Sequence, residues 1–205
     1  MTDRMLPLLG GAGHERSDAA RNRELLLQAA RRLVERCGVR GVTMASVATE
    51  AGVGKGTVFR RFDSRAGLMA ALLNHFESAW QAAVISGPPP LGPGAPPLDR
   101  LLAFGRSRIA LNLQHAELIE AAATSFGRPY AAYSFAATHV RYLLSQLGVA
   151  GDLPVLATAL LAPLEVVILQ QQVHIEGMEV ARIESGWSDL VHRVVGQVGT
   201  PSVAT

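Results

Sequence analysis

The sequence predicts an all-helical protein in which a three-helix unit near the N-terminus precedes a second helical domain. Of the 205 residues, 49% are apolar and only 5% are aromatic, a composition that favours helices packed through leucine, valine and alanine. Apolar residues recur at helical spacing along most of the chain. Residues 43–68 add two short helical patterns separated by a glycine turn, which is the arrangement of a helix-turn-helix.

The first helix is predicted to begin near Ser17 or Asp18 and to end at Gly38. Residues 1–17 lack a periodic apolar pattern and are predicted to form a flexible arm. Cys37 is the only cysteine, so no disulfide forms within the chain and an oxidising compartment is not implied. The predicted apolar face of this helix, which includes that cysteine as a core residue, is Leu26, Ala29, Ala30, Leu33, Val34 and Cys37.

The helix-turn-helix is predicted from its caps. Thr43 can cap a helix because its hydroxyl accepts from an unpaired N–H of the first turn. Gly52 stands where a left-handed C-terminal residue is needed. A second short helix is predicted over residues 54–62, and Ser64 can cap a third. The predicted apolar side of the second helix is Val58, Phe59 and Phe62. Since the second helix of such a motif enters the major groove, DNA is the predicted partner.

Unusual residues in this interval favour the same partner. Gly54 and Gly56 fall in the first turn of a short helix, where each lowers helix stability by up to about 1 kcal/mol relative to alanine. Glycine at these positions would be explained if this end of the helix approached another surface closely. Arg65 falls in the first turn of the third helix and opposes the helix dipole by about 0.3–1 kcal/mol. A DNA phosphate at that end would reverse the sign of this effect.

The stretch from Asn22 to Leu68 resembles the DNA-binding domain of the TetR family of transcriptional regulators. The family usually has tyrosine where Phe59 stands and histidine where Arg61 stands, so one hydroxyl is missing and one full charge is added. The resemblance implies a dimeric regulator, most often a repressor, with a ligand pocket in the C-terminal part. The matching segments are Asn22–Gly38, Gly41–Thr43, Val47–Ala48, Ala51–Val53, Lys55–Phe62, Ser64–Arg65 and Leu68.

The predicted DNA-binding residues have two roles. Thr43, Arg61 and Arg65 are expected to hold phosphates, which give position and affinity. Lys55 and Thr57 are expected to read base edges, and since lysine favours guanine we expect a sensitive G·C pair in each half-site. The complete predicted set is Thr43, Lys55, Gly56, Thr57, Phe59, Arg60, Arg61 and Arg65.

Charge and composition divide the chain. Residues 1–85 hold 12 Lys and Arg against 8 Asp and Glu, whereas residues 86–205 hold 7 against 9, so a basic part precedes an acidic one. Residues 86–97 are rich in proline and glycine and are predicted to be a linker. We therefore expect a DNA-binding domain over 18–85, ending in a transmitter helix from Ser64 to Ile85, and a ligand-binding and dimerisation domain over 98–205. The boundary between them is expected inside residues 86–97 or at the transmitter helix before them.

The second domain is predicted to be helical throughout. Its most apolar run, Leu153–Leu169, contains Pro163 and Glu165 and is shorter than the roughly 20 residues of a membrane span. We interpret this run as part of a buried helix, with no membrane partner. The start of the chain has too short an apolar run for a secretory signal, and a cytoplasmic location is expected. The predicted helices cover residues 98–115, 116–126, 130–147, 152–175 and 178–198.

The last two of these helices predict a homodimer. A helix that is apolar nearly all round needs cover on all sides, and a second copy would supply it as a two-fold four-helix interface. The alternative is that both helices lie inside one chain. The predicted interface residues are Leu156, Leu160, Leu164, Val180, Ile183, Trp187, Leu190 and Val194.

A pocket for an unknown small molecule, apolar or amphipathic, is predicted where polar and aromatic residues interrupt apolar helices. The alternative for each residue is a surface side chain or a satisfied core polar group. The predicted ligand-binding residues are Trp80, Phe104, Arg108, Asn112, Phe126, Tyr133, His139, Gln170 and His174.

Other chemistry has little support in the sequence. Residues 52–57, GVGKGT, fail as a phosphate-binding loop because Thr49 replaces the first glycine and Gly56 replaces the Ser or Thr after the lysine. The six histidines show no metal-ligand spacing, and no catalytic motif is present. No cofactor, metal or enzymatic activity is expected. The competing hypotheses are a helical small-molecule-binding or enzymatic protein with a vestigial DNA-binding part, and a purely structural helical dimer.

Overall fold

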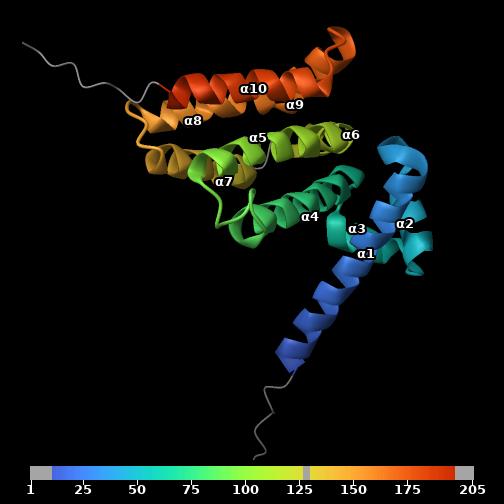
Figure 1. Cartoon of the computed structure of the whole chain (residues 1–205). Coiled ribbons are helices and arrows are strands. Elements are labelled where there is room, and N and C mark those ends of the chain that lie inside the picture. Colours follow the sequence, from blue (N-terminus) through green and yellow to red (C-terminus); the bar gives the residue numbers. More distant parts are fainter. Residues whose placement is uncertain (1–10, 127–129, 197–205) are drawn as a thin grey trace, which may run out of the picture. The chain divides into compact units, whose positions relative to one another are not determined.

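The computed structural model describes residues 11–126 and 130–196, and this part of the chain contains helices and turns but no strand. The predicted all-helical fold class is confirmed. The chain divides inside helix α4 into two compact units, Met1–Leu72 and Leu73–Thr205, which we call the head and the body (Figure 1).

The head consists of three helices and the start of a fourth. The bounds are α1 Gly11–Gly41, α2 Met44–Ala51, α3 Lys55–Phe62 and α4 Arg65–Ser86. α1 begins at Gly11, so the predicted start near residue 17 is wrong, while residues 1–10 of the predicted arm lie outside the described residues. The extension was missed because it has no apolar stripe. Gly38 interrupts α1 with a φ of 71°, close to the predicted end of the helix.

Apolar residues from all four helices form the core of the head. They include Leu26, Leu33, Val47, Val58, Leu68 and Leu72. Cys37 is exposed, so its predicted place in the core is wrong. It lies one turn beyond Leu33, and its Sγ donates to the Leu33 carbonyl at 3.0 Å.

The body is a set of helices around α5, which contacts α7, α9 and α10. In Figure 1, α10 (red) runs beside α8 and α9 (orange). The bounds are α5 Pro97–Gln114, α6 Ala116–Phe126, α7 Tyr130–Gln146, α8 Leu153–Leu161, η1 Ala162–Leu164, α9 Val166–Gln170, η2 Gln171–Ile175 and α10 Val180–Val195.

Residues 86–97 connect α4 and α5 within the body. The sequence places the domain boundary either in this segment or at the transmitter helix before it, and the division falls in that helix, between Leu72 and Leu73. The second half of α4 belongs to the body because Glu77, Trp80 and Val84 are buried in it. α4 is therefore a continuous helix that contributes residues to both units.

The apolar run in the body is not one buried helix. η1 interrupts it at Pro163, and Glu165 has extended backbone angles before α9 begins, because proline has no N–H to continue the helical bonding. Leu153–Ile175 has the length and mean hydropathy of a membrane-crossing segment, which alone is weak evidence for a span. Only 28% of its most apolar window is buried, so the predicted complete burial is wrong. Val167 and Ile175 are 72% and 74% exposed.

Candidate nucleic-acid interface and ligand site

Local hydrogen bonds fix both ends of α2, the first helix of the helix-turn-helix. Thr43 Oγ1 accepts from the Ser46 N–H at 3.0 Å, and Ser46 Oγ accepts from the Thr43 N–H at 2.9 Å. This reciprocal cap satisfies two backbone donors at the start of α2. Gly52 ends the helix with a φ of 67°, and the Val53 N–H donates to the Ala48 carbonyl at 3.0 Å. The predicted cap and the predicted left-handed glycine are both confirmed.

α3 has one face in the core of the head and the other in solvent. Val58 and Phe62 are buried, whereas Phe59 is 42% exposed, so the sequence pattern was wrong to place Phe59 on the apolar side. Residues 58 and 62 are one turn apart and therefore lie on the same face of the helix, whereas residue 59 lies on another face. Lys55 Nζ lies 5.8 Å from the centre of the Phe59 ring. The exposed cations of α3 are Lys55, Arg60 and Arg61.

The two glycines at the start of α3 border open space. A Cβ added to Gly54 or Gly56 would meet no atom within 4 Å. No contact in the described part of the chain therefore requires glycine at either position. The two glycines therefore add no side chain to the exposed start of α3. Thr57, which follows them, is half-buried.

One acid of α2 pairs with two arginines of α1. Arg32 Nε and Arg36 Nη2 lie 3.1 and 2.9 Å from the Glu50 carboxylate. The hydrogen bond from Arg36, followed by that from Arg32, holds the pKa of Glu50 below its ordinary value. Within the described residues, no acid pairs with the three cations of α3, so its exposed face keeps a positive charge.

Arg65 has structural partners inside the head. Its Nε donates to the Val42 carbonyl at 2.8 Å and its Nη2 donates to the Val39 carbonyl at 2.5 Å. These bonds tie the start of α4 to the segment between α1 and α2. Ser64 Oγ accepts from the Gly67 N–H at 3.0 Å, so its predicted capping role is confirmed.

Side-chain contacts join α4 to α5 in the body. Arg108 Nη1 donates to Glu77 Oε2 at 2.8 Å, and both side chains are almost fully buried. Trp80 Nε1 donates to Ser107 Oγ at 3.0 Å. The Arg108 guanidinium also lies 4.9 Å from the centre of the Trp80 ring, a distance suited to a cation–π contact. No local pattern in the sequence points to Glu77 or to its partner 31 positions away.

Two half-buried histidines lie in aromatic surroundings. The rings of His115 and Phe76 stack with centres 4.0 Å apart, and burial lowers the pKa of His115. His139 stacks on Phe104 with centres 5.3 Å apart. Burial, with a smaller contribution from Arg100, lowers the pKa of His139 to about 4. Both rings are therefore neutral at pH 7, and Nε2 of His139 is buried without a hydrogen-bond partner.

The predicted ligand residues divide by burial. Phe104, Arg108 and Asn112 are buried with Trp80 in the body, and His174 is exposed. Asn112 Nδ2 donates to the Leu164 carbonyl at 2.5 Å, while its Oδ1 is buried without a partner. The half-buried members are Tyr133, His139 and Gln170. The side chain of Phe126 lies outside the described residues.

Half of the predicted dimer residues lie inside the core of one chain. Trp187 Nε1 donates to the Leu160 carbonyl at 2.8 Å, and a Cβ on Gly105 would overlap the Trp187 ring. The buried four, which offer almost no surface to a partner, are Leu160, Leu164, Ile183 and Trp187. Their assignment to the interface is wrong, because an apolar stripe can serve either a core or a dimer. Val180 is exposed, and Leu156, Leu190 and Val194 are half-buried.

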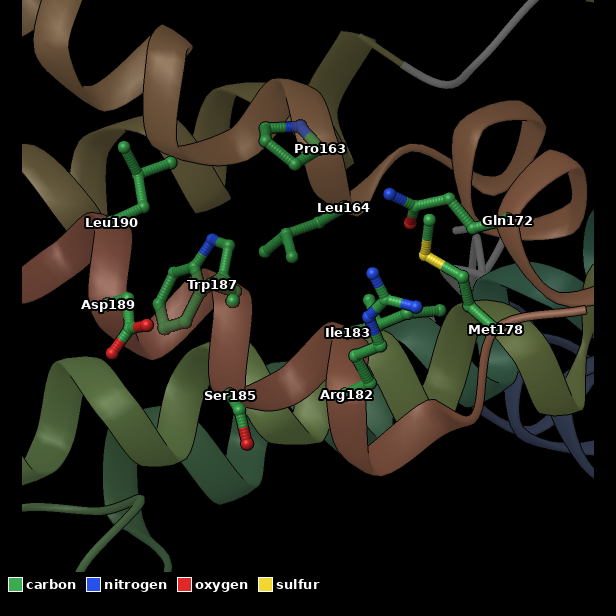
Figure 2. A pocket seen from close by; sticks show the side chains of 11 residues that line it. Pro163, Leu164, Gln172, Met178, Arg182, Ile183, Ser185, Trp187, Asp189 and Leu190 are labelled. Atoms are coloured by element: carbon green, nitrogen blue, oxygen red, sulfur yellow. The ribbon is translucent and has the colours of Figure 1, made fainter. Parts of the chain in front are cut away.

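An open groove of about 500 Å³ lies along α10. Figure 2 shows Arg182 and Asp189 on α10 on either side of Trp187, with Pro163 and Leu164 across the groove. Gln172 lines it, and its Oε1 is buried without a hydrogen-bond partner. None of these charged or amide residues was singled out from the sequence.

The geometry of the head is that of a helix-turn-helix, the motif whose second helix enters the DNA major groove, and a helical body follows it. Residues 26–72 match the family model described as bacterial regulatory proteins, tetR family. The helix-turn-helix domain is therefore that of the tetR family, and the resemblance predicted from the sequence is confirmed. A search among curated proteins finds no relative of the chain.

Solved structures share the fold over most of their length. A transcriptional regulator from Saccharomonospora viridis in complex with choline is 19% identical, with a TM-score of 0.63 over 84% of this chain and 96% of that one. A TetR transcriptional regulator from Streptomyces coelicolor is 25% identical, with a TM-score of 0.53 over 84% and 97%. The multidrug binding protein EbrR complexed with imidazole is 24% identical, with a TM-score of 0.57 over 89% and 92%. The body thus has the fold of these regulators.

Proposed function

We propose that the chain is a homodimeric repressor that binds a pseudo-palindromic DNA operator and is released by a small molecule held in its body. The observation that carries the DNA-binding proposal is the exposed face of α3. Its three cations have no acidic partner among the described residues, and two glycines beside them leave open space. A cation without a partner in the chain is available to a phosphate or a base edge.

The exposed residues of α3 would divide between two roles. Lys55, with Thr57, would read base edges at the start of the helix, because the flanking glycines permit close approach. Arg60 and Arg61 would hold phosphates, and Thr43 would add a phosphate contact at the start of α2. Arg65 would act as a positioning residue, since two of its donors are already bonded to backbone carbonyls.

The test is a footprint on the DNA that flanks the protein's own coding region. We expect a protected pseudo-palindrome, and we expect Lys55→Ala to lose at least tenfold in affinity for it because one good base contact contributes about 1–3 kcal/mol. Arg141→Ala is the matched control, since it removes an exposed cation from α7 in the body. Equal loss in both variants would contradict the proposal. Unchanged binding by Lys55→Ala would support a vestigial head.

α4 would carry the signal from ligand to DNA. It runs through both units, and its second half is bonded to α5 through Glu77 and Trp80. A ligand that displaced α5 would therefore pull on α4 and change how the two α3 helices of a dimer match successive grooves. Such coupling is typically worth about 1–3 kcal/mol.

The body favours an uncharged, apolar or amphipathic ligand. Arg108 is neutralised by Glu77 and covers one face of the Trp80 ring, and His139 is neutral at pH 7. Two buried atoms, Oδ1 of Asn112 and Nε2 of His139, lack hydrogen-bond partners and could orient such a ligand. A thermal-shift screen should show stabilisation by neutral aromatic compounds, and loss of that shift in His139→Phe would identify the site. Stabilisation by quaternary ammonium compounds alone would contradict this ligand class.

A dimer is proposed from the exposed apolar residues beside α10. Val167, Ile175 and Val180 are exposed together with Val155 and Ile168, and a second copy that covered these side chains would remove their apolar area from water. A helix-turn-helix regulator reads two half-sites as a dimer, so this surface is where we expect a second copy.

A further inference from the structure

One face of α10 carries an ordered row of exposed residues. Spacings of three and four positions place them in line along the helix. Gly186 lies at the centre of this row, and a Cβ there would meet no atom within 4 Å. Glycine inside a helix is unfavourable by roughly 0.5–1 kcal/mol relative to alanine, and no contact in the described part of the chain requires it. The members of the row are Glu179, Arg182, Gly186, Asp189 and Arg193.

The charges in the row are antisymmetric about Gly186. Reading outward, the basic Arg182 on one side corresponds to the acidic Asp189 on the other, and the acidic Glu179 corresponds to the basic Arg193. None of these four side chains forms an ion pair within the described residues. Arg182, Gly186 and Asp189 also line the groove beside α10 (Figure 2).

This pattern matches a second copy of the same helix in one orientation. In a two-fold interface, residue i contacts residue j of the partner, and j contacts i. If two such helices crossed in parallel, each charge would face its own equivalent, and like charges at close range are destabilising. If they crossed antiparallel at Gly186, every charge would face the opposite sign. Glycine at the crossing point would also let the two backbones approach closely.

We propose that α10 of two copies cross antiparallel at Gly186, so that Arg182 faces the partner subunit's Asp189 and Glu179 faces the partner subunit's Arg193. The occupant of this surface is therefore a second copy of the chain, and the charges set the register of the pair and its selectivity. This inference rests on the proposed homodimer. It adds the crossing point and the residues that recognise the partner.

The test is an exchange of charges measured by sedimentation velocity. Arg182→Glu places like charges together at both ends of the crossing, and so does Asp189→Arg. We expect each variant to raise the dimer dissociation constant about tenfold or more. The double variant, with the two signs exchanged, should return close to the wild-type value. Arg141→Glu, an exposed reversal on α7, is the matched control and should leave the constant unchanged.

Mixing the two single variants gives a sharper outcome. In their heterodimer both contacts are again between opposite charges, so native mass spectrometry with one tagged variant should show heterodimers in at least tenfold excess over either homodimer. Gly186→Leu should dissociate the dimer while the monomer stays folded by circular dichroism, since the position has open space around it.

The outcomes separate this inference from the homodimer itself. A wild-type protein that is monomeric at tens of micromolar would overturn both. A wild-type dimer that is unaffected by the two charge reversals and by Gly186→Leu would leave the homodimer standing and overturn the proposed crossing.

Discussion

α3 of the head and the contact between α4 and α5 in the body place their cations in opposite ways. On α3 of the head, Lys55 and its two neighbouring arginines are exposed and have no acidic partner among the described residues. In the body, Arg108 is buried and bonded to Glu77 at 2.8 Å. An exposed cation stabilises the fold little and is free to bind a partner, whereas a buried pair fixes two helices relative to each other. Substitutions in the two units should therefore affect different properties.

The largest effect on folding is expected from breaking the buried pair. Glu77→Ala should lower the free energy of unfolding by about 3–5 kcal/mol, because it leaves the Arg108 charge buried without a partner. Replacing both residues together, as Glu77→Leu with Arg108→Met, should recover most of that loss. Urea denaturation measures both. A double variant no more stable than the single one would show that the pair itself, rather than the orphaned charge, determines the stability.

Alanine substitutions at two glycines, one in the body and one in the head, should change stability in opposite directions. Gly105→Ala should destabilise the body by about 1–3 kcal/mol, because the added Cβ would overlap Trp187. Gly56→Ala should stabilise the head by about 0.5–1 kcal/mol, because its Cβ would meet nothing, and yet weaken DNA binding. Thermal unfolding and mobility shift give the two readouts. A Gly56→Ala protein that binds DNA as well as wild type would contradict the proposal that glycine is needed there for close approach to DNA.

Two arginines of the head should separate stability from binding. Arg65→Ala should cost about 1–3 kcal/mol of stability because it removes charged hydrogen bonds to two carbonyls. Arg61→Ala should change stability by less than about 0.5 kcal/mol but should reduce the salt slope of DNA binding by about 2 per dimer. Parallel denaturation and salt titrations compare the variants. Equal effects on both properties would contradict the division.

A pH dependence of stability is expected from His139. Its folded pKa of about 4 lies below the value of about 6.5 in an unfolded chain, so the unfolded state takes up a proton first as the pH falls. Stability should therefore be unaffected above pH 7, decline between about pH 6.5 and 4, and level off below that. Since the ring is partly exposed, solvent screening should limit this loss to about 1–2 kcal/mol. His139→Gln should lack this component when both proteins are unfolded by urea at pH 7 and pH 5.

The helix-turn-helix could be predicted almost residue by residue because its signals are local. The Thr43 cap, the left-handed Gly52 and the spacing of Val58 and Phe62 each act within one or two turns of helix. The structural role of Arg65 could not be predicted in this way. Its partners lie 23 and 26 positions earlier in the chain, and no local pattern records such a bond.

The body was predicted less well because one pattern has two explanations. Ile183 and Trp187 repeat at helical spacing whether they face a core or a partner, and the structure buries both in one chain. In the sequence, Pro163 and Glu165 argue against a membrane span. They also mark the break between α8 and α9, which the predicted single helix over residues 152–175 lacks. The pairing of Glu77 with Arg108 depends on how α4 and α5 pack, which the sequence of neither helix specifies.

The most direct test of the charge comparison is the salt dependence of operator affinity. Arg60 and Arg61 of each subunit would give about four charged phosphate contacts per dimer. The slope of log K against log salt concentration should then be about −3.6 for the wild type, and Arg141→Ala should have the same slope. A slope near zero in the wild type would contradict the assignment of the exposed α3 cations to DNA.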